Sequence, residues 1–236
     1  MTIVLAHRGA SRRERENTLA AFAVARALGA PWVELDVRLA SDGALVVHHD
    51  PSYGDGRAVH ATPGDERPAH VPLLAEALAA CEGMHVNVEI KNSEGELGYD
   101  PTAAVVRPTV AVIVAAGWRD RVLVSCFNRA TLGAVRAAEG ALATAFLTAQ
   151  VPIEAAERDD WLAGLAADGH TALHPLWPLA DAELIVACHA AGLAVNVWTC
   201  DDPGAIRRLA GWGVDGICTN VPDVALAALA SARLPE

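Results

Sequence analysis

Short apolar runs rich in Val, Ile and Leu alternate along the chain with longer Ala-rich stretches whose apolar residues recur at helical spacing. Near-continuous apolar runs are typical of parallel strands buried on both faces, and the longer stretches are typical of the helices that cover them. The alternation repeats eight times. The pattern predicts strands at residues 3–7, 32–37, 86–91, 121–126, 142–147, 171–174, 194–199 and 214–218.

Glycines support the same division. Gly29, Gly117, Gly192 and Gly213 each stand shortly before the next predicted strand, where a helix C-cap is expected. Eight strand–helix repeats in 236 residues match the usual size of a closed (β/α)₈ barrel. We therefore predict an α/β fold, a TIM barrel of eight parallel strands, with a six-stranded open sheet as the structural alternative.

The alternation is interrupted between about residues 42 and 72. The segment begins with the hairpin-like run DGALVVHHD and continues as a polar loop rich in Gly and Pro. Such a composition is typical of turns and loops rather than core. We expect one domain over residues 1–236, with a loop or hairpin excursion after the second strand.

Charge limits the classes of partner. The chain has 18 Lys and Arg against 29 Asp and Glu, a formal net charge of −11. This balance argues against binding to nucleic acid or to anionic lipid surfaces. An anionic small molecule would have to be attracted by a local cluster of cations or by a bound metal ion.

The cysteines and the apolar runs indicate the compartment. The five cysteines, which contain no CxxC pair, are expected to be reduced thiols. We find neither a signal-peptide pattern nor an apolar run of about 18 residues, and so expect a cytoplasmic protein without stable membrane association. The sequence carries no readable signal for the oligomeric state. The cysteines are Cys81, Cys126, Cys188, Cys200 and Cys218.

Ionisable residues concentrate at the ends of the first three predicted strands. Chemistry in a (β/α)₈ barrel lies at the carboxyl ends of the strands. Residues two apart on a strand share a face, so Glu34 lies beside Asp36 and Glu89 beside Lys91. The first strand ends in His7 followed by Arg8.

Three carboxylates that meet at one rim suit a hard divalent cation such as Mg²⁺ or Ca²⁺. The alternative is that Glu34 and Asp36 form salt bridges with Arg8, Arg38 or Lys91 and bind no metal. Spacing alone leaves both interpretations open.

Two histidines lie near this rim. A single histidine at a strand end is often structural, but His7 and His49 beside a carboxylate cluster favour acid–base chemistry, because imidazoles exchange protons near neutral pH. Arg8 and Lys91 would supply the local cations that a phosphate needs.

Ordered motifs run along nearly the whole chain, and in sequence and spacing they resemble the signature of the glycerophosphodiester phosphodiesterases. The resemblance implies a (β/α)₈ barrel that hydrolyses glycerophosphodiesters to glycerol 3-phosphate and an alcohol. The matching motifs are HRG at 7–9, ENTLAAF at 16–22, ELDV at 34–37, DG at 42–43, VVHHD at 46–50, VPL with Glu76 at 71–76, EIK at 89–91, WT at 198–199 and DGICTN with PD at 215–223.

The resemblance also implies roles for the charged residues. Glu34, Asp36 and Glu89 would hold one divalent cation, Mg²⁺ or Ca²⁺. Arg8 and Lys91 would contact the phosphate.

His7 and the histidine immediately before Asp50, which is His49, would perform the acid–base chemistry. His48 is the competing residue, because alternation along residues 45–49 would turn the two imidazoles to opposite sides. Family analogy favours His7 as base and His49 as acid.

The remaining implied roles concern the pocket wall and its support. Phe127 and Trp198 would line the pocket, and Glu16 would support the site. Arg15 stands where the family has proline, and residues 51–57 replace a tract common in the family. These departures leave the headgroup preference open.

Two other functions remain as alternatives. One is a phospholipase D-like phosphodiesterase that acts on lysophospholipids, which the acidic charge and the lack of an exposed apolar segment disfavour. The other is a non-catalytic barrel that binds glycerophosphodiesters. Such a protein would normally have lost one of the key acidic or histidine residues, and this chain keeps them all.

Overall fold

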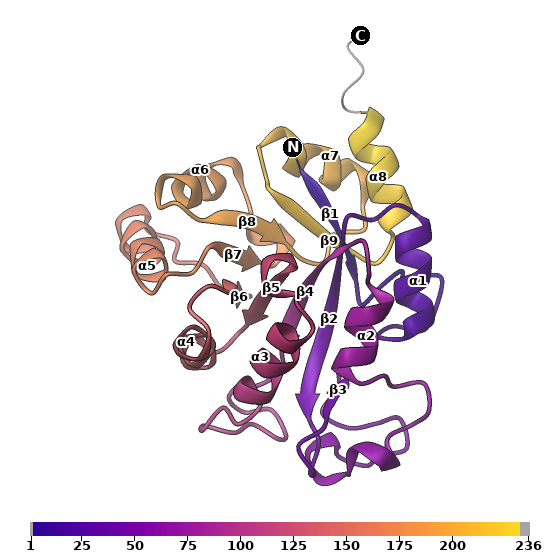
Figure 1. Ribbon diagram of the computed structural model, residues 1–236. Helices are drawn as coiled ribbons and strands as arrows, with labels where there is room; N and C mark the ends of the chain where they lie inside the picture. The colour runs from indigo at the N-terminus through magenta and orange to yellow at the C-terminus, as the bar shows by residue number, and fades with distance from the viewer. Residues whose placement is uncertain (1, 232–236) are drawn as a thin grey trace.

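The computed structural model describes residues 2–231, and within them nine strands form one closed sheet (Figure 1). The strand order is β1-β9-β8-β7-β6-β5-β4-β2-β3, and the sheet closes because β1 also pairs with β2. All strands but β3 pair in parallel. The strands are β1 (Ile3–His7), β2 (Trp32–Leu39), β3 (Leu45–Val47), β4 (His85–Ile90), β5 (Val122–Cys126), β6 (Ala143–Thr148), β7 (Ala172–Pro175), β8 (Ala194–Val197) and β9 (Gly216–Thr219).

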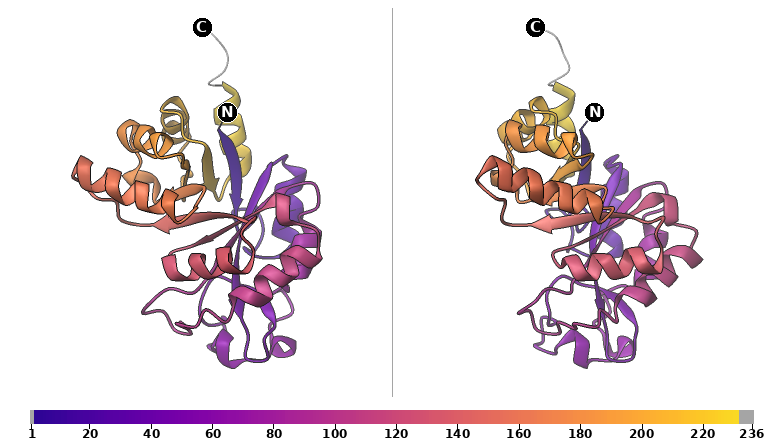
Figure 2. Two further views of the ribbon diagram at one scale, coloured as in Figure 1. Left: turned by 60° about the vertical axis from the view of Figure 1, so that its left-hand side comes forward. Right: turned by 90° about the vertical axis from the view of Figure 1, so that its left-hand side faces the viewer.

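The helices lie around the outside of this sheet (Figures 1 and 2). Their apolar sides pack on the strands in two large clusters of buried aliphatic side chains. The arrangement is an eight-stranded TIM barrel with one extra strand, as predicted. The helices are α1 (Leu19–Ala27), α2 (Leu74–Ala80), α3 (Val106–Ala115), α4 (Arg129–Ala138), α5 (Ala155–Ala167), α6 (Ala182–Ala190), α7 (Pro203–Gly211) and α8 (Pro222–Ser231).

Local sequence explains where several helices begin and end. The side chains of Thr18, Asn128, Asp181 and Asp202 cap α1, α4, α6 and α7 by accepting a hydrogen bond from a backbone N–H in the first turn. The four glycines expected at helix ends all have positive φ, between 72° and 92°. All eight predicted strands are present, with ends that differ by no more than two residues. The open-sheet alternative is wrong, because the pairing of β1 with β2 closes the barrel.

The segment after β2 folds back along it. β3 pairs antiparallel with β2, with Val47 opposite Val37 and Leu45 opposite Leu39. β3 ends at Val47, so it is shorter than the predicted run to residue 49. The segment has its own small core, which includes Val46 and Tyr53. Figure 1 shows it at the lower end of β2, away from the start of β1.

The turn after β1 is tightly constrained. Arg8 and Gly9 both have positive φ, 54° and 83°. A Cβ atom on Gly9 would lie 2.7 Å from the backbone carbon of Ala21 in α1, so the helix fits against the turn only because residue 9 has no side chain. The turn directs the backbone N–H of Arg8 to the Glu34 carboxylate, 2.9 Å away.

Gly9→Ala should therefore destabilise the fold more than Gly29→Ala, a matched control. Gly29 has nearly the same φ, 82°, but an added Cβ would meet nothing within 4 Å. The left-handed conformation should cost each variant roughly 1–2 kcal/mol, and the overlap with α1 about 1–3 kcal/mol more in Gly9→Ala. Urea unfolding of both variants measures the difference. Equal losses would show that the contact with α1 is unimportant.

Candidate active site

Three carboxylates meet at the carboxyl end of β2 and β4. Asp36 and Glu89 are direct partners in the strand register, and Glu34 precedes Asp36 on the same face of β2. One oxygen from each carboxylate lies within 4.8 Å of the other two. Their exposed fractions are 3%, 1% and 9% for Glu34, Asp36 and Glu89. The structure thus brings together the three acidic residues that the sequence suggested as metal ligands.

Two cations partly compensate these charges. Lys91 Nζ lies 2.8 Å from Glu89 Oε1 and 3.8 Å from Asp36 Oδ1, and Arg8 Nε lies 3.3 Å from Asp36 Oδ2. The salt bridges considered for Arg8 and Lys91 therefore form. These salt bridges leave two carboxylate oxygens without a hydrogen bond. Glu34 Oε1 and Asp36 Oδ1 are buried and have no hydrogen-bond partner among residues 2–231.

The pKa shifts of the three carboxylates reflect the same shortage of positive charge. Burial, Asp36 and Glu89 raise the pKa of Glu34 well above its ordinary value. Burial also raises the pKa of Glu89, and Lys91 only partly opposes it. For Asp36, burial alone would raise the pKa, but Lys91 and Arg8 outweigh it and hold the pKa low. An all-oxygen donor set with two unpartnered oxygens fits a hard divalent cation.

His7 has a defined tautomer. Its Nδ1 lies 2.7 Å from Asn220 Oδ1, and the Asn220 amide nitrogen donates to Asp201 Oδ2 at 2.8 Å. Because the amide donates to Asp201, the Asn220 oxygen accepts, and His7 Nδ1 must carry the proton. Nε2 is left with a free lone pair, 3.9 Å from Glu34 Oε2.

The environment also keeps His7 neutral. Burial and the neighbouring Arg8 guanidinium lower the pKa of His7, and together they outweigh the hydrogen bond that His7 donates to Asn220, which raises it. A neutral imidazole with a free Nε2 can accept a proton or bind a metal ion.

The two adjacent histidines have different surroundings. The His48 ring is held in the excursion, with Nε2 3.2 Å from the Ser52 carbonyl oxygen and the ring centroid 5.2 Å from that of Tyr53. His49 Nδ1 instead donates to Asp50 Oδ1 at 2.7 Å. Arg38 fixes the backbone at this point, because its Nε and Nη2 donate to the His49 carbonyl oxygen at 2.9 and 2.6 Å.

His49 also acts on the carboxylates. Burial favours a higher pKa for Asp36, and Lys91, Arg8 and the nearby His49 ring lower it. For Glu89, His49 likewise opposes the effect of burial. Asp36 affects the pKa of His48 too, so the two histidines differ in their contacts: the His48 ring lies against Ser52 and Tyr53, whereas the His49 ring pairs with Asp50.

Comparison with known proteins shows to which family the chain is similar. A sequence model of the glycerophosphoryl diester phosphodiesterase family matches residues 7–59 and 52–224. A glycerophosphodiester phosphodiesterase of Caldanaerobacter subterraneus is 30% identical over 94% of this chain and 95% of its own length. A glycerophosphodiester phosphodiesterase of Bacillus altitudinis is 30% identical over 96% of this chain and 97% of its own length.

A solved structure is similar to this chain over nearly its whole length. A phosphodiesterase of Oleispira antarctica, solved with the product sn-glycerol-3-phosphate, is 27% identical and superposes with a TM-score of 0.86 over 98% of this chain and 97% of its own.

The chain belongs to the glycerophosphoryl diester phosphodiesterase family.

In this family member two aromatic side chains stand beside the charged cluster. Phe127 and Trp198 pack edge to face with centroids 5.4 Å apart, and Lys91 Nζ lies 6.0 Å from the Phe127 ring centroid. The Trp198 Nε1–H donates to the His174 carbonyl oxygen at 2.8 Å, which fixes the indole. The two rings expected at the pocket wall are therefore adjacent to each other and to a site cation.

Glu16 contacts the site through Arg8. Arg8 Nη1 donates to both Glu16 carboxylate oxygens at 2.9 and 3.1 Å, and Glu16 itself is exposed. It can orient the guanidinium but is not itself part of the buried cluster.

Sequence reasoning missed three residues that orient the site. Asn17, with φ of 56°, donates from Nδ2 to Asp36 Oδ2 at 2.7 Å. Asn220 and Asp201 fix His7, as described above. Asn17 and Asn220 both lie within the quoted motifs, so their position was visible, but no pattern in the sequence indicated which side chain each would contact.

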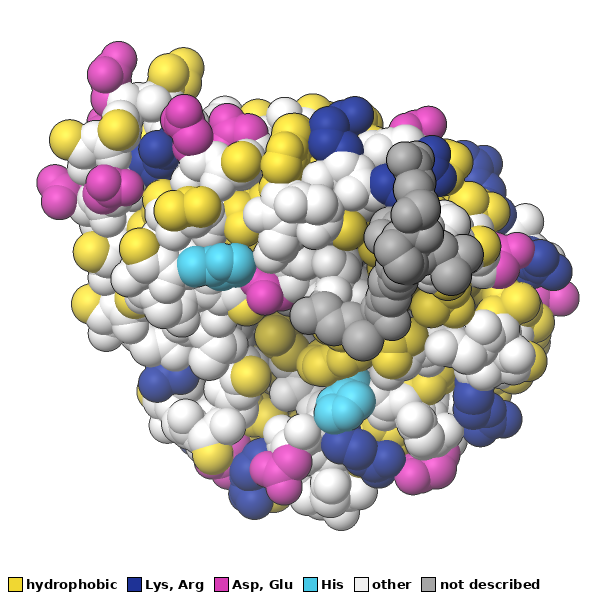
Figure 3. Space-filling model, turned by 90° about the horizontal axis from the view of Figure 1, so that it is seen from above, with side chains coloured by type: hydrophobic (Ala, Val, Ile, Leu, Met, Phe, Trp, Pro, Cys, Tyr) yellow, Lys and Arg dark blue, Asp and Glu magenta, His cyan; other side chains and the backbone are white. Residues whose placement is uncertain are grey.

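The face opposite the excursion is shown in Figure 3. Hydrophobic, acidic and basic side chains are interspersed there, without a continuous basic patch among the described residues on this face. No helix within residues 2–231 is long and apolar enough to cross a membrane.

Addition of Mg²⁺ or Ca²⁺ to chelator-treated protein should raise Tm, because an ion that binds the folded cluster stabilises the native state. At about 100 times Kd the gain is ~2.7 kcal/mol, or roughly 5–10 °C for a chain of this size. Asp36→Asn should abolish most of the shift. Glu183→Gln, on the exposed surface of α6, should keep it. Equal shifts in all three proteins would exclude the cluster as the metal site.

Proposed function

We propose that the protein hydrolyses glycerophosphodiesters to glycerol 3-phosphate and an alcohol, with a divalent cation and two histidines. The observation that carries the proposal is the position of His7, whose Nε2 lies 3.9 Å from Glu34 Oε2, beside a buried carboxylate cluster in which two oxygens have no hydrogen-bond partner within residues 2–231. The family membership and the glycerol-3-phosphate bound to the Oleispira relative support the choice of substrate.

Glu34, Asp36 and Glu89 would hold one cation, Mg²⁺ or Ca²⁺. When bound, it would offset negative charge on the non-bridging phosphate oxygens and act as a Lewis acid. Both unpartnered oxygens of the cluster, one on Glu34 and one on Asp36, would then have a partner.

Arg8 and Lys91 would bind the phosphate. Their side chains are only 16% and 8% exposed. Partly desolvated cations bind phosphate oxygens more strongly than fully hydrated ones, and the guanidinium can donate two parallel hydrogen bonds. Glu16 would keep the Arg8 guanidinium in orientation.

His7 would act as the base. Its Nε2 accepts the proton of the nucleophile, which is water or the neighbouring glycerol hydroxyl, as the nucleophile's oxygen bonds to phosphorus. Asn220 and Asp201 would keep Nε2 directed at the reaction and stabilise the imidazolium that forms, as a carboxylate does when it is hydrogen-bonded to the other ring nitrogen of a histidine. His49 would donate a proton to the departing alcohol oxygen as its bond to phosphorus breaks, and Asp50 would orient that ring.

Phe127 and Trp198 would form the apolar wall for the glycerol or leaving-group carbons. Their edge-to-face packing and the hydrogen bond from the indole hold both rings in place without the substrate. A preformed wall of this kind reduces the entropy lost on binding.

Purified protein should release glycerol 3-phosphate from glycerophosphocholine and glycerophosphoethanolamine. Chelator should stop the release and added Mg²⁺ or Ca²⁺ should restore it, because the cluster alone is short of positive charge. A coupled glycerol 3-phosphate assay measures both. Absence of release from any glycerophosphodiester with restored metal, or turnover of lysophosphatidylcholine alone, would refute the proposal.

His49→Ala should lower kcat/KM by about 10²–10⁴, the usual contribution of general acid–base catalysis. His48→Ala serves as the matched neighbour and should lower it by less than about tenfold, because its ring is held by Ser52 and Tyr53. Thermal unfolding of each variant separates lost stability from lost chemistry. The assignment is wrong if the two effects are reversed.

A further inference from the structure

A small cavity lies inside the barrel next to the carboxylate cluster. Its volume is about 20 Å³, and His7, Glu34, Glu89 and Cys218 are among its lining residues. A space of this size holds a single water molecule or ion, since one water needs about 10–15 Å³. It is too small for an organic ligand.

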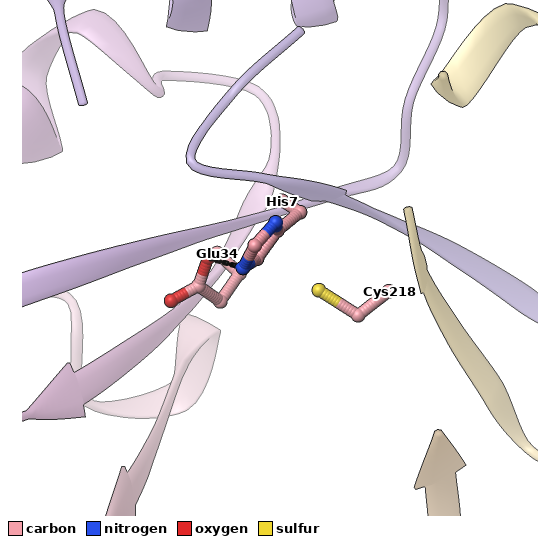
Figure 4. A group of neighbouring side chains, drawn as sticks. All are labelled: His7, Glu34 and Cys218. Carbon is pink, nitrogen blue, oxygen red and sulfur yellow. Dashed lines mark ion pairs between the residues drawn. The ribbon is translucent and has the colours of Figure 1, made fainter. Parts of the chain in front are cut away.

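Three different donor atoms converge on this cavity. A ring nitrogen of His7, a carboxylate oxygen of Glu34 and Cys218 Sγ all lie within 4.8 Å of one another (Figure 4). The barrel register causes this: His7 is paired with Glu34 across β1 and β2, and Cys218 is paired with Leu5, two residues before His7 on the same face of β1. The site therefore depends on the pairing of β1 with both of its neighbours.

Each donor is available. Glu34 is 3% exposed, and the oxygen that faces His7 is Oε2, which accepts one hydrogen bond from the Arg8 backbone N–H and keeps a lone pair for a metal ion. His7 Nε2 is the unprotonated ring nitrogen, because Nδ1 donates to Asn220. Cys218 is a buried free thiol. A histidine whose second nitrogen is fixed by a hydrogen bond is typical of a metal ligand.

We propose that His7, Glu34 and Cys218 form a second metal site, selective for a divalent ion with affinity for sulfur such as Zn²⁺. Nitrogen, oxygen and thiolate sulfur are the ligands that Zn²⁺ takes in proteins, with a fourth position open to water. The neighbouring cluster, with oxygen ligands only, suits Mg²⁺ or Ca²⁺ instead.

Binding at this site releases one proton. The Cys218 S–H bond breaks, the proton passes to the buffer, and a sulfur–metal bond forms without any change in oxidation state. The ligand atoms must also draw closer together than in the metal-free arrangement, because zinc–ligand bonds are about 2.0–2.3 Å long.

Occupancy of this site draws Glu34, which belongs to both sites, toward the second ion and weakens the hold of the oxygen cluster on its own ion. It also engages the lone pair of His7. Zn²⁺ is therefore an inhibitor that competes with the activating ion, a consequence that rests on the proposed function, whereas the binding itself does not.

The binding is tested with Co²⁺ as a spectroscopic substitute for Zn²⁺ in chelator-treated full-length protein. The wild type should show a thiolate-to-cobalt charge-transfer band in the near ultraviolet, which one equivalent of Zn²⁺ abolishes. Asp36→Asn, which changes a ligand of the oxygen cluster and none of the three ligands of this site, should keep the band. Cys218→Ala should lose it and bind Zn²⁺ at least tenfold more weakly, while Cys188→Ala, a buried thiol in the core on α6, should behave as the wild type.

A second measurement needs no variant. X-ray absorption of the wild-type zinc complex should show one sulfur neighbour at about 2.3 Å. Only nitrogen and oxygen neighbours, or a cobalt band that survives in Cys218→Ala, would overturn the proposal. Both readouts report metal ligation directly, so they remain decisive if the protein hydrolyses no glycerophosphodiester.

Discussion

The arrangement of the site depends on one electrostatic constraint, the burial of three carboxylates with only two cations beside them. Glu34, Asp36 and Glu89 are almost fully removed from water, while Arg8 and Lys91 compensate two of the three charges. Buried charge without a partner is costly, so the fold must supply positive charge from elsewhere. Burial is the first cause of the raised pKa of Glu34, and the neighbouring Asp36 and Glu89 carboxylates add to it.

The polypeptide accepts local strain to hold this cluster. Arg8 and Asn17 are non-glycine residues with positive φ, and each donates a hydrogen bond to one of the carboxylates. Unfavourable backbone conformations of this kind persist where the surrounding packing enforces them. Here α1 packs against Gly9 between them and holds the loop in place.

His7 connects two sets of interactions. On one side Asn220 and Asp201 fix the protonated Nδ1, and on the other side Nε2 faces Glu34 and the cavity that Cys218 lines. The same nitrogen is therefore suited to accept a proton in one state and to bind a thiophilic metal in another. Under the two proposals, the ion that occupies Glu34 would decide between these uses, because an oxygen-only set and a sulfur-containing set select different metals.

The sequence by itself determined the barrel and the composition of the carboxylate cluster. Apolar strands that alternate with helices allow few other folds, and residues two apart on a strand must share a face, so Glu34 joins Asp36. The carboxyl-end rule for barrels then brought Glu89 and Lys91 to the same rim. These features follow from local periodicity and from a general property of the fold.

Only the tertiary structure decided the surroundings of the histidines. Alternation along residues 45–49 could not separate His48 from His49, because β3 ends at Val47 and contacts with Ser52, Tyr53 and Arg38 set the two rings. The tautomer of His7 depends on Asn220, which lies 213 positions away in the chain. Cys218 reaches Glu34 only through barrel closure. Such contacts join segments that no local pattern relates, so they appear only when the sheet has closed.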